Sequence, residues 1–362
     1  MHGPASSNLP QDPNARRRRL LSRVAMAAGG ITSAGLGTAA YVVRAITRAS
    51  KASPYDHYGY TPYEVGIAHE DVRIPSRVGD SLSGWWLPRP ETQRAILVCY
   101  GYRNRKADTL GISAALWRSG YNVLIFDYHG HGEHVGTPVS LGYREADDAL
   151  DAVAYLCRRL PGARLGAIGY SMGASIAIMA AARDRRIEAV VADSPFAAQR
   201  NPVLRQLRRQ MHISLGGRLL LDVADLLLYR RFGYRFRDVE PLREVPALGQ
   251  RPLLLIHGLN DTVIDAHDSE LLYEAASGPK QFWQVPNCEH CGAYFADRHA
   301  YVRRVTAFFN QGLGGDGIGD PAVEKVQLEE DSQGQHQDQH QQDSHQRRPG
   351  PRLIRLVQAL LP

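Results

Sequence analysis

Ser171 is the residue whose surroundings most clearly suit chemistry. Residues 169–173 have the pattern Gly-x-Ser-x-Gly and lie between residues 164–168, which can form a short buried strand, and residues 174–181, which suit a closely packed helix. A sharp turn at this point strains the backbone and leaves no room for a Cβ beside the serine, which explains the two glycines. By itself the pattern is also compatible with a structural turn. Together with the rest of the chain it predicts an exposed serine hydroxyl that acts as a nucleophile.

A nucleophilic serine needs two further residues. Its hydroxyl is weakly reactive at neutral pH, so a histidine must take its proton and a carboxylate must orient that histidine. Asp261 ends a His-Gly-x-x-Asp segment after the apolar residues 253–256, and His290 follows another such run at residues 281–285. Both loops are expected at the carboxyl end of a parallel sheet, where such sheets bind ligands. The predicted catalytic residues are therefore Ser171, Asp261 and His290.

Other residues compete for the roles of acid and base. Asp193 also follows an apolar run, but Asp261 has the fuller loop signature and is preferred. Three further histidines are alternative bases: His257, His267 and His299. The first fits a structural role at a strand end, and the other two fall on expected helices.

The cysteines do not indicate a redox or metal site. The four cysteines, Cys99, Cys157, Cys288 and Cys291, are too few for a disulfide framework and leave the redox compartment open. The segment Cys-Glu-His-Cys around His290 lacks a fourth metal ligand, and a metal on His290 would block its work as a base. We therefore predict no metal and no cofactor.

The elements that position these residues alternate between strands and helices. Residues 72–74 and 82–87 suit an antiparallel edge hairpin. After it, continuous apolar runs alternate with helical stretches of ten or more residues, which predicts a parallel sheet covered on both faces. These runs occupy residues 95–100, 123–126, 164–168, 189–192, 253–256 and 281–285. Residues 198–250 break the alternation, carry ten arginines and five acids, and are expected to form a helical lid, with an ordinary helical excursion as the alternative.

The N-terminal region has the charge pattern of a membrane anchor. Residues 24–43 contain no charged residue and have basic residues on both sides. Twenty helical residues can span a bilayer's hydrocarbon core, so we predict a disordered basic N-terminus at 1–23 followed by a transmembrane or signal-anchor helix at 24–43. Its weakly apolar composition leaves a cleaved secretion signal or a surface helix as alternatives. The surplus of arginines before the helix predicts an extracytoplasmic catalytic domain, and removal of residues 1–51 is expected to leave that domain soluble and active.

Composition sets the remaining boundaries. We expect a linker at 52–69, one domain at 70–310, and a disordered Gln- and His-rich tail at 311–362 with a short amphipathic end. The formal charge is +6, but residues 1–51 contain eight Lys or Arg and one Asp, leaving 35 basic and 36 acidic residues in the other 311. A nucleic-acid-binding protein would carry its basic patch on the folded domain, so we predict no nucleic-acid partner.

From about residue 72 to residue 309 the chain resembles the α/β-hydrolases, in particular serine-aminopeptidase-like and bacterial esterase-type members. The resemblance rests on the Gly-x-Ser-x-Gly run, the Asp-Tyr-His-Gly-His-Gly segment at 127–132, the His-Gly-x-x-Asp loop, and the order Ser171, Asp261, His290. It implies an α/β-hydrolase fold and an oxyanion hole made by the backbone N–H groups of Tyr102 and Met172. The chain departs from this family in two places, with Tyr100-Gly101 where many relatives have His-Gly, and His129 where relatives often have arginine.

These inferences predict a membrane-tethered serine hydrolase. It is expected to cleave an ester, thioester or amide bond of a small-molecule or lipid-like acyl substrate through an acyl-enzyme intermediate. The alternative is a catalytically silent α/β-hydrolase fold that serves as a binding or scaffold protein. The same residues serve esterases and peptidases, so the sequence does not separate these activities, and it leaves the oligomeric state open.

Overall fold

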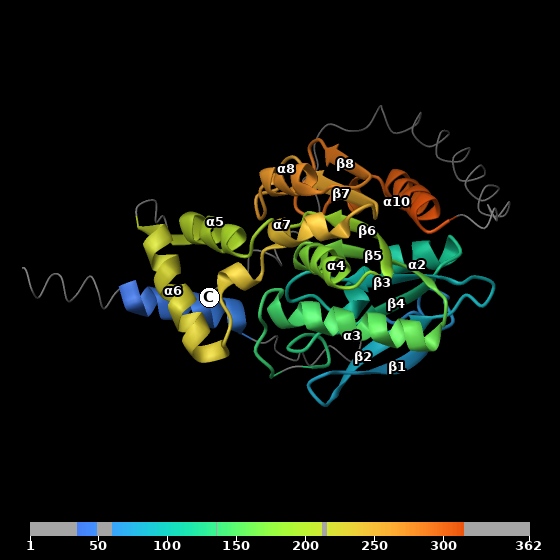
Figure 1. The fold of residues 1–362 in the computed structure, drawn as a ribbon, viewed down its shortest axis with the longest axis horizontal. Coiled ribbons are helices and arrows are strands. Elements are labelled where there is room, and N and C mark those ends of the chain that lie inside the picture. The colour runs from blue at the N-terminus through green and yellow to red at the C-terminus, as the bar shows by residue number, and fades with distance from the viewer. Residues whose placement is uncertain (1–34, 49–59, 135, 212–215, 315–362) are drawn as a thin grey trace, which may run out of the picture.

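An eight-stranded sheet with the strand order β1-β2-β4-β3-β5-β6-β7-β8 forms the centre of the protein (Figure 1). The computed structural model describes residues 35–48, 60–134, 136–211 and 216–314. Strands β3 to β8 are parallel, β2 is antiparallel to β4, and β1 is antiparallel to β2. The strands are β1 Glu70–Pro75, β2 Ser81–Leu87, β3 Arg94–Cys99, β4 Asn122–Phe126, β5 Arg164–Tyr170, β6 Ile187–Asp193, β7 Leu253–Gly258 and β8 Lys280–Val285.

Helices cover both faces of this sheet because its strands are apolar on both sides. Within β3, Leu97 packs into the core beneath α3 and α4, whereas Ile96 and Val98 pack on the opposite face beneath α2 and α10. The helices of the sheet domain are α2 Leu110–Arg118, α3 Tyr143–Arg159, α4 Met172–Arg183, α8 Ala266–Ala275, α9 Ala293–Ala296 and α10 Arg298–Gly312, with the 3₁₀ turn η2 at Lys106–Thr109. The predicted fold class, a mostly parallel sheet with helices on both faces, is confirmed, as is the antiparallel edge hairpin.

The segment between β6 and β7 is helical, and we call residues 198–250 the lid segment. Its elements are α5 Arg200–Met211, α6 Gly217–Phe232, η3 Phe236–Asp238, α7 Pro241–Glu244 and η4 Val245–Leu248. Helices α5 and α6 lie to one side of the sheet domain (Figure 1). The last part returns to the sheet domain, because Val245 and Leu248 are buried in the core beneath α4 and Glu244 forms an ion pair with Arg183.

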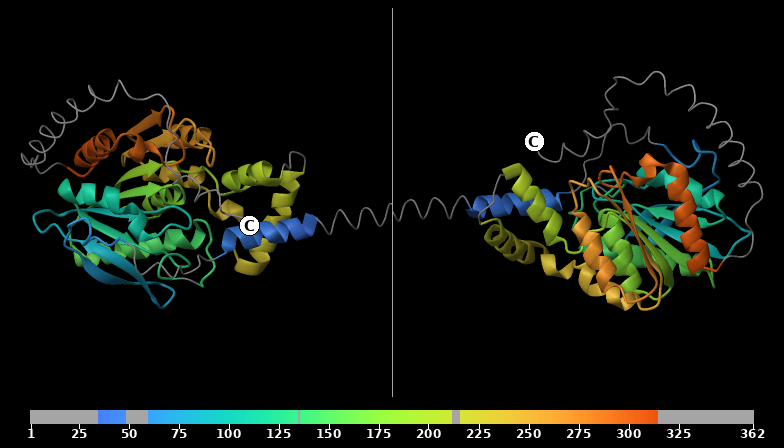
Figure 2. Two further views of the ribbon diagram at one scale, coloured as in Figure 1. Left: turned by 180° about the vertical axis from the view of Figure 1, so that it is seen from behind. Right: turned by 90° about the horizontal axis from the view of Figure 1, so that it is seen from above.

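An N-terminal helix packs against the lid segment. Residues 35–47 are helical and lie beside α5 and α6 in every view (Figure 2). Ala39, Val42 and Val43 are buried in a cluster with apolar side chains of the lid segment, namely Val203, Leu207, Leu221, Ala224, Leu228, Tyr234 and Phe236. The second half of the predicted membrane helix therefore belongs to the surface of the lid segment.

Several predictions concern residues outside the described ranges. They are the basic N-terminus, residues 24–34 of the predicted membrane helix, most of the linker, and the tail beyond residue 314. Among the described residues, no helix is both long enough and apolar enough to cross a membrane. The domain boundaries remain predictions.

Candidate active site

Ser171 lies on the turn between β5 and α4. Its backbone has φ 54° and ψ −120°, a strained conformation for a residue with a side chain. The Ser171 N–H donates a hydrogen bond of 2.8 Å to the Asp193 carbonyl at the end of the neighbouring strand β6. The turn is thus fixed to the carboxyl end of the sheet, and it presents the serine hydroxyl to His290.

The two glycines of the turn are required by close backbone contacts. A Cβ added to Gly169 would lie 2.1 Å from the Gly173 carbonyl oxygen, and a Cβ added to Gly173 would lie 2.1 Å from the Cys99 carbonyl oxygen. Both distances are far below van der Waals contact. Strand β5, helix α4 and the end of β3 can approach this closely only because neither glycine has a side chain.

The three predicted catalytic residues form one hydrogen-bonded chain. His290 Nε2 lies 2.9 Å from Ser171 Oγ, and His290 Nδ1 lies 2.6 Å from Asp261 Oδ2. An ionised carboxylate only accepts hydrogen bonds, so Nδ1 carries the proton and Nε2 accepts from the serine hydroxyl. In this tautomer the histidine can take the serine proton, and the resulting positive charge faces a carboxylate.

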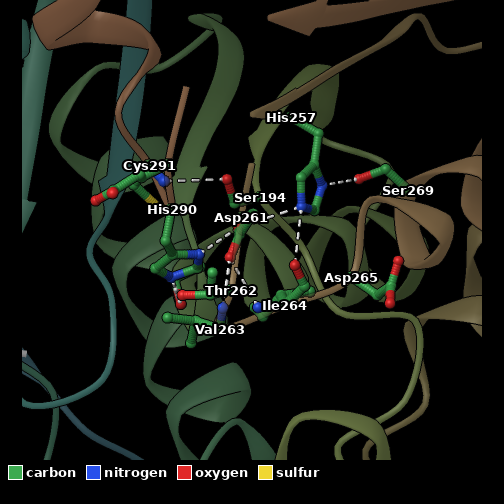
Figure 3. A network of polar contacts seen from close by, with 12 residues as sticks. Ser194, His257, Asp261, Thr262, Val263, Ile264, Asp265, Ser269, His290 and Cys291 are labelled. Atoms are coloured by element: carbon green, nitrogen blue, oxygen red, sulfur yellow. Dashed lines mark hydrogen bonds and ion pairs between the residues drawn. The ribbon is translucent and has the colours of Figure 1, made fainter. Parts of the chain in front are cut away.

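Asp261 is held in place from several sides (Figure 3). Its Oδ1 accepts hydrogen bonds from the backbone N–H groups of Val263 at 2.7 Å and Ile264 at 2.9 Å. Its Oδ2 faces both His290 and His257, whose Nε2 lies 3.2 Å away. Burial by itself would raise the pKa of Asp261, but the hydrogen bonds from His257 and His290 outweigh it and hold that pKa well below its usual value. Asp261 is therefore ionised across the physiological pH range.

The side chains of the rival acid and bases have other partners than Ser171 and His290. Asp193 is fully buried, and its carboxylate accepts hydrogen bonds from Tyr301 and Ser194, both at 3.0 Å. His257 lies behind Asp261 and pairs on its other side with Ser269 at 2.7 Å. Of the remaining histidines, His267 is exposed beside Glu270 on α8, and His299 is exposed at the start of α10. The structure thus brings only one of these rival histidines near the site, and that one contacts the acid.

The loop after β3 passes beside the nucleophile. A Cβ on Gly101 would lie 3.4 Å from Ser171 Cβ, so the Tyr102 backbone begins next to the serine. Met172 follows Ser171 in the chain and begins α4, and the N-terminus of a helix favours negative charge. The two predicted oxyanion donors therefore flank Ser171 on separate elements.

Comparisons with known proteins identify the family. A family model described as serine aminopeptidase, S33, matches residues 90–225. YqkD of Bacillus subtilis is 33% identical over 241 residues, which cover 66% of this chain and 78% of YqkD. The chain belongs to the α/β-hydrolase superfamily.

Solved structures agree with this α/β-hydrolase assignment at the level of the fold. The Pyrococcus furiosus esterase Pf2001 superposes with a TM-score of 0.62 at 23% identity, covering 74% of this chain and 98% of the esterase. A Mycobacterium tuberculosis puromycin-hydrolyzing peptidase superposes with a TM-score of 0.55 at 18% identity, covering 68% of this chain and 40% of the peptidase. The family-model match ends before Asp261 and His290, so the proposal that these residues act as acid and base rests on their geometry.

Tyr100 and His129, the two positions at which this α/β-hydrolase departs from the expected family pattern, each have hydrogen-bond partners nearby. The Tyr100 hydroxyl donates to Asp127 Oδ1 at 3.1 Å and accepts from the Tyr128 N–H at 3.0 Å. His129 lies between Asp148 at 2.7 Å and Asp80 at 2.8 Å. The hydrogen bond with Asp148 is the main reason that the pKa of His129 rises to about 9, so at neutral pH this histidine carries the positive charge that an arginine would supply.

The two cysteines near His290 are free thiols that support its loop. The Cys291 N–H donates to Ser194 Oγ at 3.2 Å, and the Cys288 carbonyl accepts from the Asn260 N–H at 2.9 Å. Burial raises the pKa of Cys288 to about 11 and that of Cys291 well above its usual value. Among the residues that the structure describes, no group of His, Cys, Asp or Glu side chains is placed to hold a metal ion.

Three contacts of the site were missed by the sequence analysis. They are the His257–Asp261 pair, the contacts of α5 with the Asp261 loop, and the contacts of Tyr102 with the N-terminal helix. On α5, Arg205 pairs with Asp265, and Arg209 donates to the Thr262 carbonyl at 2.5 Å. The spacing within His-Gly-x-x-Asp was a sequence signal for the His257–Asp261 pair. No sequence signal pointed to the other two contacts, because each joins segments about 55 residues apart in the chain.

Proposed function

We propose that this α/β-hydrolase is a serine hydrolase that cleaves an ester, thioester or amide bond through an acyl-enzyme intermediate. The observation that carries the proposal is the hydrogen-bonded chain from Ser171 through His290 to Asp261. A chain of this kind occurs on unrelated folds that perform acyl transfer, so its geometry is more informative than the fold alone.

In the proposed reaction, Ser171 Oγ attacks the carbonyl carbon of the substrate while His290 Nε2 takes the hydroxyl proton. Asp261 stabilises the positive charge that forms on His290. The backbone N–H groups of Tyr102 and Met172 donate hydrogen bonds to the negative oxygen of the tetrahedral intermediate. His290 then returns the proton to the leaving group, and a water molecule activated by the same histidine releases the acyl group from Ser171.

The proposal is tested with the single substitution Ser171→Ala. Purified full-length protein is assayed with p-nitrophenyl esters of increasing acyl length, with an acyl thioester, and with an aminoacyl p-nitroanilide. The variant should lose hydrolysis of every substrate that the wild-type protein turns over, while its circular dichroism spectrum and melting temperature stay close to those of the wild type. Equal turnover by the two proteins would contradict the proposal, and would favour a silent binding or scaffold protein with contaminating activity.

Two finer features are also proposals. The substrate class, a small-molecule or lipid-like acyl compound, is supported by the family and is addressed by the same substrate series. Membrane tethering through residues 24–43 is supported by their uncharged sequence between basic flanks. Ala39 and Val42 pack against the lid segment, so a helix that spans the membrane up to Val43 would have to leave that packing. Retention in the membrane pellet after an alkaline carbonate wash would support tethering, and release into the supernatant would contradict it.

A further inference from the structure

The oxyanion loop, residues 100–106, is anchored at both ends by one buried carboxylate. Asp127 Oδ1 accepts a hydrogen bond from the Tyr100 hydroxyl at 3.1 Å and another from the Lys106 N–H at 2.9 Å. The Lys106 ammonium group, itself almost fully buried, pairs with Asp127 Oδ2 at 2.9 Å and with Glu133 at 2.5 Å. Buried, charge-assisted hydrogen bonds of this kind define the loop ends rigidly.

The middle of the oxyanion loop is under strain. Arg103 has φ 62°, a left-handed conformation that is unfavourable for a residue with a side chain. Such a conformation persists only when surrounding contacts hold it. Tyr102, whose N–H is the proposed oxyanion donor, directly precedes this strained residue.

The middle of the loop is held by a backbone hydrogen bond of 3.2 Å from the Asn104 N–H to the Gly101 carbonyl, and by side-chain contacts with the N-terminal helix. The Tyr102 hydroxyl lies 3.1 Å from the Ala45 carbonyl oxygen and 3.2 Å from the Ile46 carbonyl oxygen, and the Arg103 guanidinium lies 3.4 Å from the Ala45 oxygen. The last four carbonyl groups of a helix have no partner within that helix, so these two carbonyls at the end of residues 35–47 are free to accept. The Arg103 guanidinium also lies over the Tyr102 ring, 5.1 Å from its centre.

The helix is in turn fixed by the lid segment. Ala39, Val42 and Val43 occupy the apolar cluster shared with α5 and α6, and Thr47 is buried near the helix end, where its hydroxyl donates to the Val43 carbonyl at 2.7 Å. Figure 2 shows this helix beside α5 and α6, with one end toward the sheet domain. A continuous set of contacts therefore runs from the lid segment through the N-terminal helix to Tyr102.

We propose that Tyr102 is a positioning residue, and that the N-terminal helix acts through its hydroxyl to fix the backbone N–H that stabilises the oxyanion. This inference rests on the proposed function and adds a role for a segment outside the sheet domain. The helix is then part of the catalytic unit, and movement of the helix or the lid segment would change catalysis through the oxyanion loop.

The test is a double-mutant cycle in the full-length protein with Tyr102→Phe and Val43→Ala. Tyr102→Phe keeps the ring and the backbone but removes the hydrogen bonds to the helix. It should lower kcat about tenfold with KM within twofold, because loss of a whole oxyanion donor lowers kcat about 10²- to 10³-fold and here the donor is only less well placed. Val43→Ala loosens the helix and should lower kcat severalfold in the wild-type background, but not further when combined with Tyr102→Phe.

The matched control is Tyr41→Ala, which changes an exposed side chain on the same helix and should leave kcat and KM unchanged. A kcat of Tyr102→Phe within twofold of wild type would overturn the inference, and so would a rise in KM alone. A loss of kcat in the double variant equal to the product of the two single losses would also overturn it, because the helix would then affect kcat independently of the Tyr102 hydroxyl. Failure of the proposed function is distinguished by the Ser171→Ala variant, which would retain hydrolysis in that case.

Discussion

At the residue scale, Asp261 and Asp193 show how two buried acids at the ends of neighbouring strands acquire different properties. Asp261 accepts hydrogen bonds from two histidines and two backbone N–H groups, which keep it ionised. Asp193 lacks such a set of donors, and burial raises its pKa to about 6. The first can stabilise a positive charge on His290, whereas the second supports the turn of Ser171 through its carbonyl.

The first prediction compares these two acids in catalysis. Asp261→Asn should lower kcat by about 10⁴-fold, because an amide favours the wrong tautomer of the histidine. Asp193→Asn should leave kcat within about tenfold, because the carbonyl that holds Ser171 is unchanged. Steady-state hydrolysis by both purified variants gives the comparison. A small loss of kcat in Asp261→Asn together with a large loss in Asp193→Asn would reverse our assignment of the acid.

The second prediction concerns stability and pH. The pKa of Asp193 is higher in the folded protein than in the unfolded chain, so its contribution to stability falls as pH rises from about 4 through about 6. Asp193→Asn removes this dependence. The free energy of unfolding, measured by urea denaturation, should therefore fall less in the variant than in the wild type between pH 4 and pH 7, by up to about 3 kcal/mol. If the free energies of unfolding of the two proteins changed equally with pH, the raised pKa of Asp193 would be contradicted.

At the element scale, the turn between β5 and α4 depends on the absence of side chains. The third prediction is that Gly169→Ala prevents correct folding, because its Cβ would overlap the Gly173 carbonyl. Gly37→Ala is the matched control, since a Cβ there meets no atom within 4 Å. Soluble yield and melting temperature compare the two variants, and a cooperative, wild-type melting transition for Gly169→Ala would show that the turn is not as tight as described.

The loop after β4 gives the fourth prediction. His129 joins Asp80, at the β1–β2 hairpin, to Asp148 on α3, and its raised pKa means that this stabilisation is complete below about pH 6.5 and is lost as pH rises through about 9. His129→Arg should keep the positive charge at higher pH. The melting temperature of the wild type should therefore fall relative to that of the variant between pH 7 and pH 10, and an equal change in both would contradict the role of His129.

Most of these elements were predictable from sequence because local patterns determine them. The apolar runs identified β3 to β8, and the Gly-x-Ser-x-Gly pattern located the turn of Ser171. The contacts of α5 with the Asp261 loop were not predictable. In the sequence, Arg205 and Arg209 do not differ from solvent-exposed arginines, because their partners lie 50 to 60 residues away in the chain. The return of α7 and η4 to the sheet domain was missed for the same reason, since it depends on burial of Val245 and Leu248 against α4.

At the scale of the whole molecule, the packing of the N-terminal helix leads us to expect a different N-terminal boundary of the folded unit. Its uncharged residues matched a membrane anchor in sequence, yet Ala39, Val42 and Val43 are buried against the lid segment. Small and β-branched side chains suit both environments, so composition alone could not separate them. The earlier expectation that the chain remains active without residues 1–51 is therefore replaced by one that places the boundary before the helix.

The fifth prediction follows from this boundary. Removal of residues 1–34 should preserve the melting temperature and kcat, whereas removal of residues 1–51 should expose the apolar cluster of the lid segment, lower the soluble yield, and reduce kcat through loss of the Tyr102 contacts. Purification and assay of both truncated proteins measure the effect. Equal activity of the two would show that the helix is dispensable.

The central claim is that Ser171 is the nucleophile that carries the acyl group during turnover, and covalent labelling of this nucleophile tests it most directly. The wild-type protein and the Ser171→Ala variant are treated with a fluorophosphonate, digested, and analysed by peptide mass spectrometry. Our account predicts one modified peptide in the wild type, with the added mass on Ser171, and no modification in the variant. A wild-type protein that turns over substrate but is labelled on another residue, or equal labelling of both proteins, would contradict it.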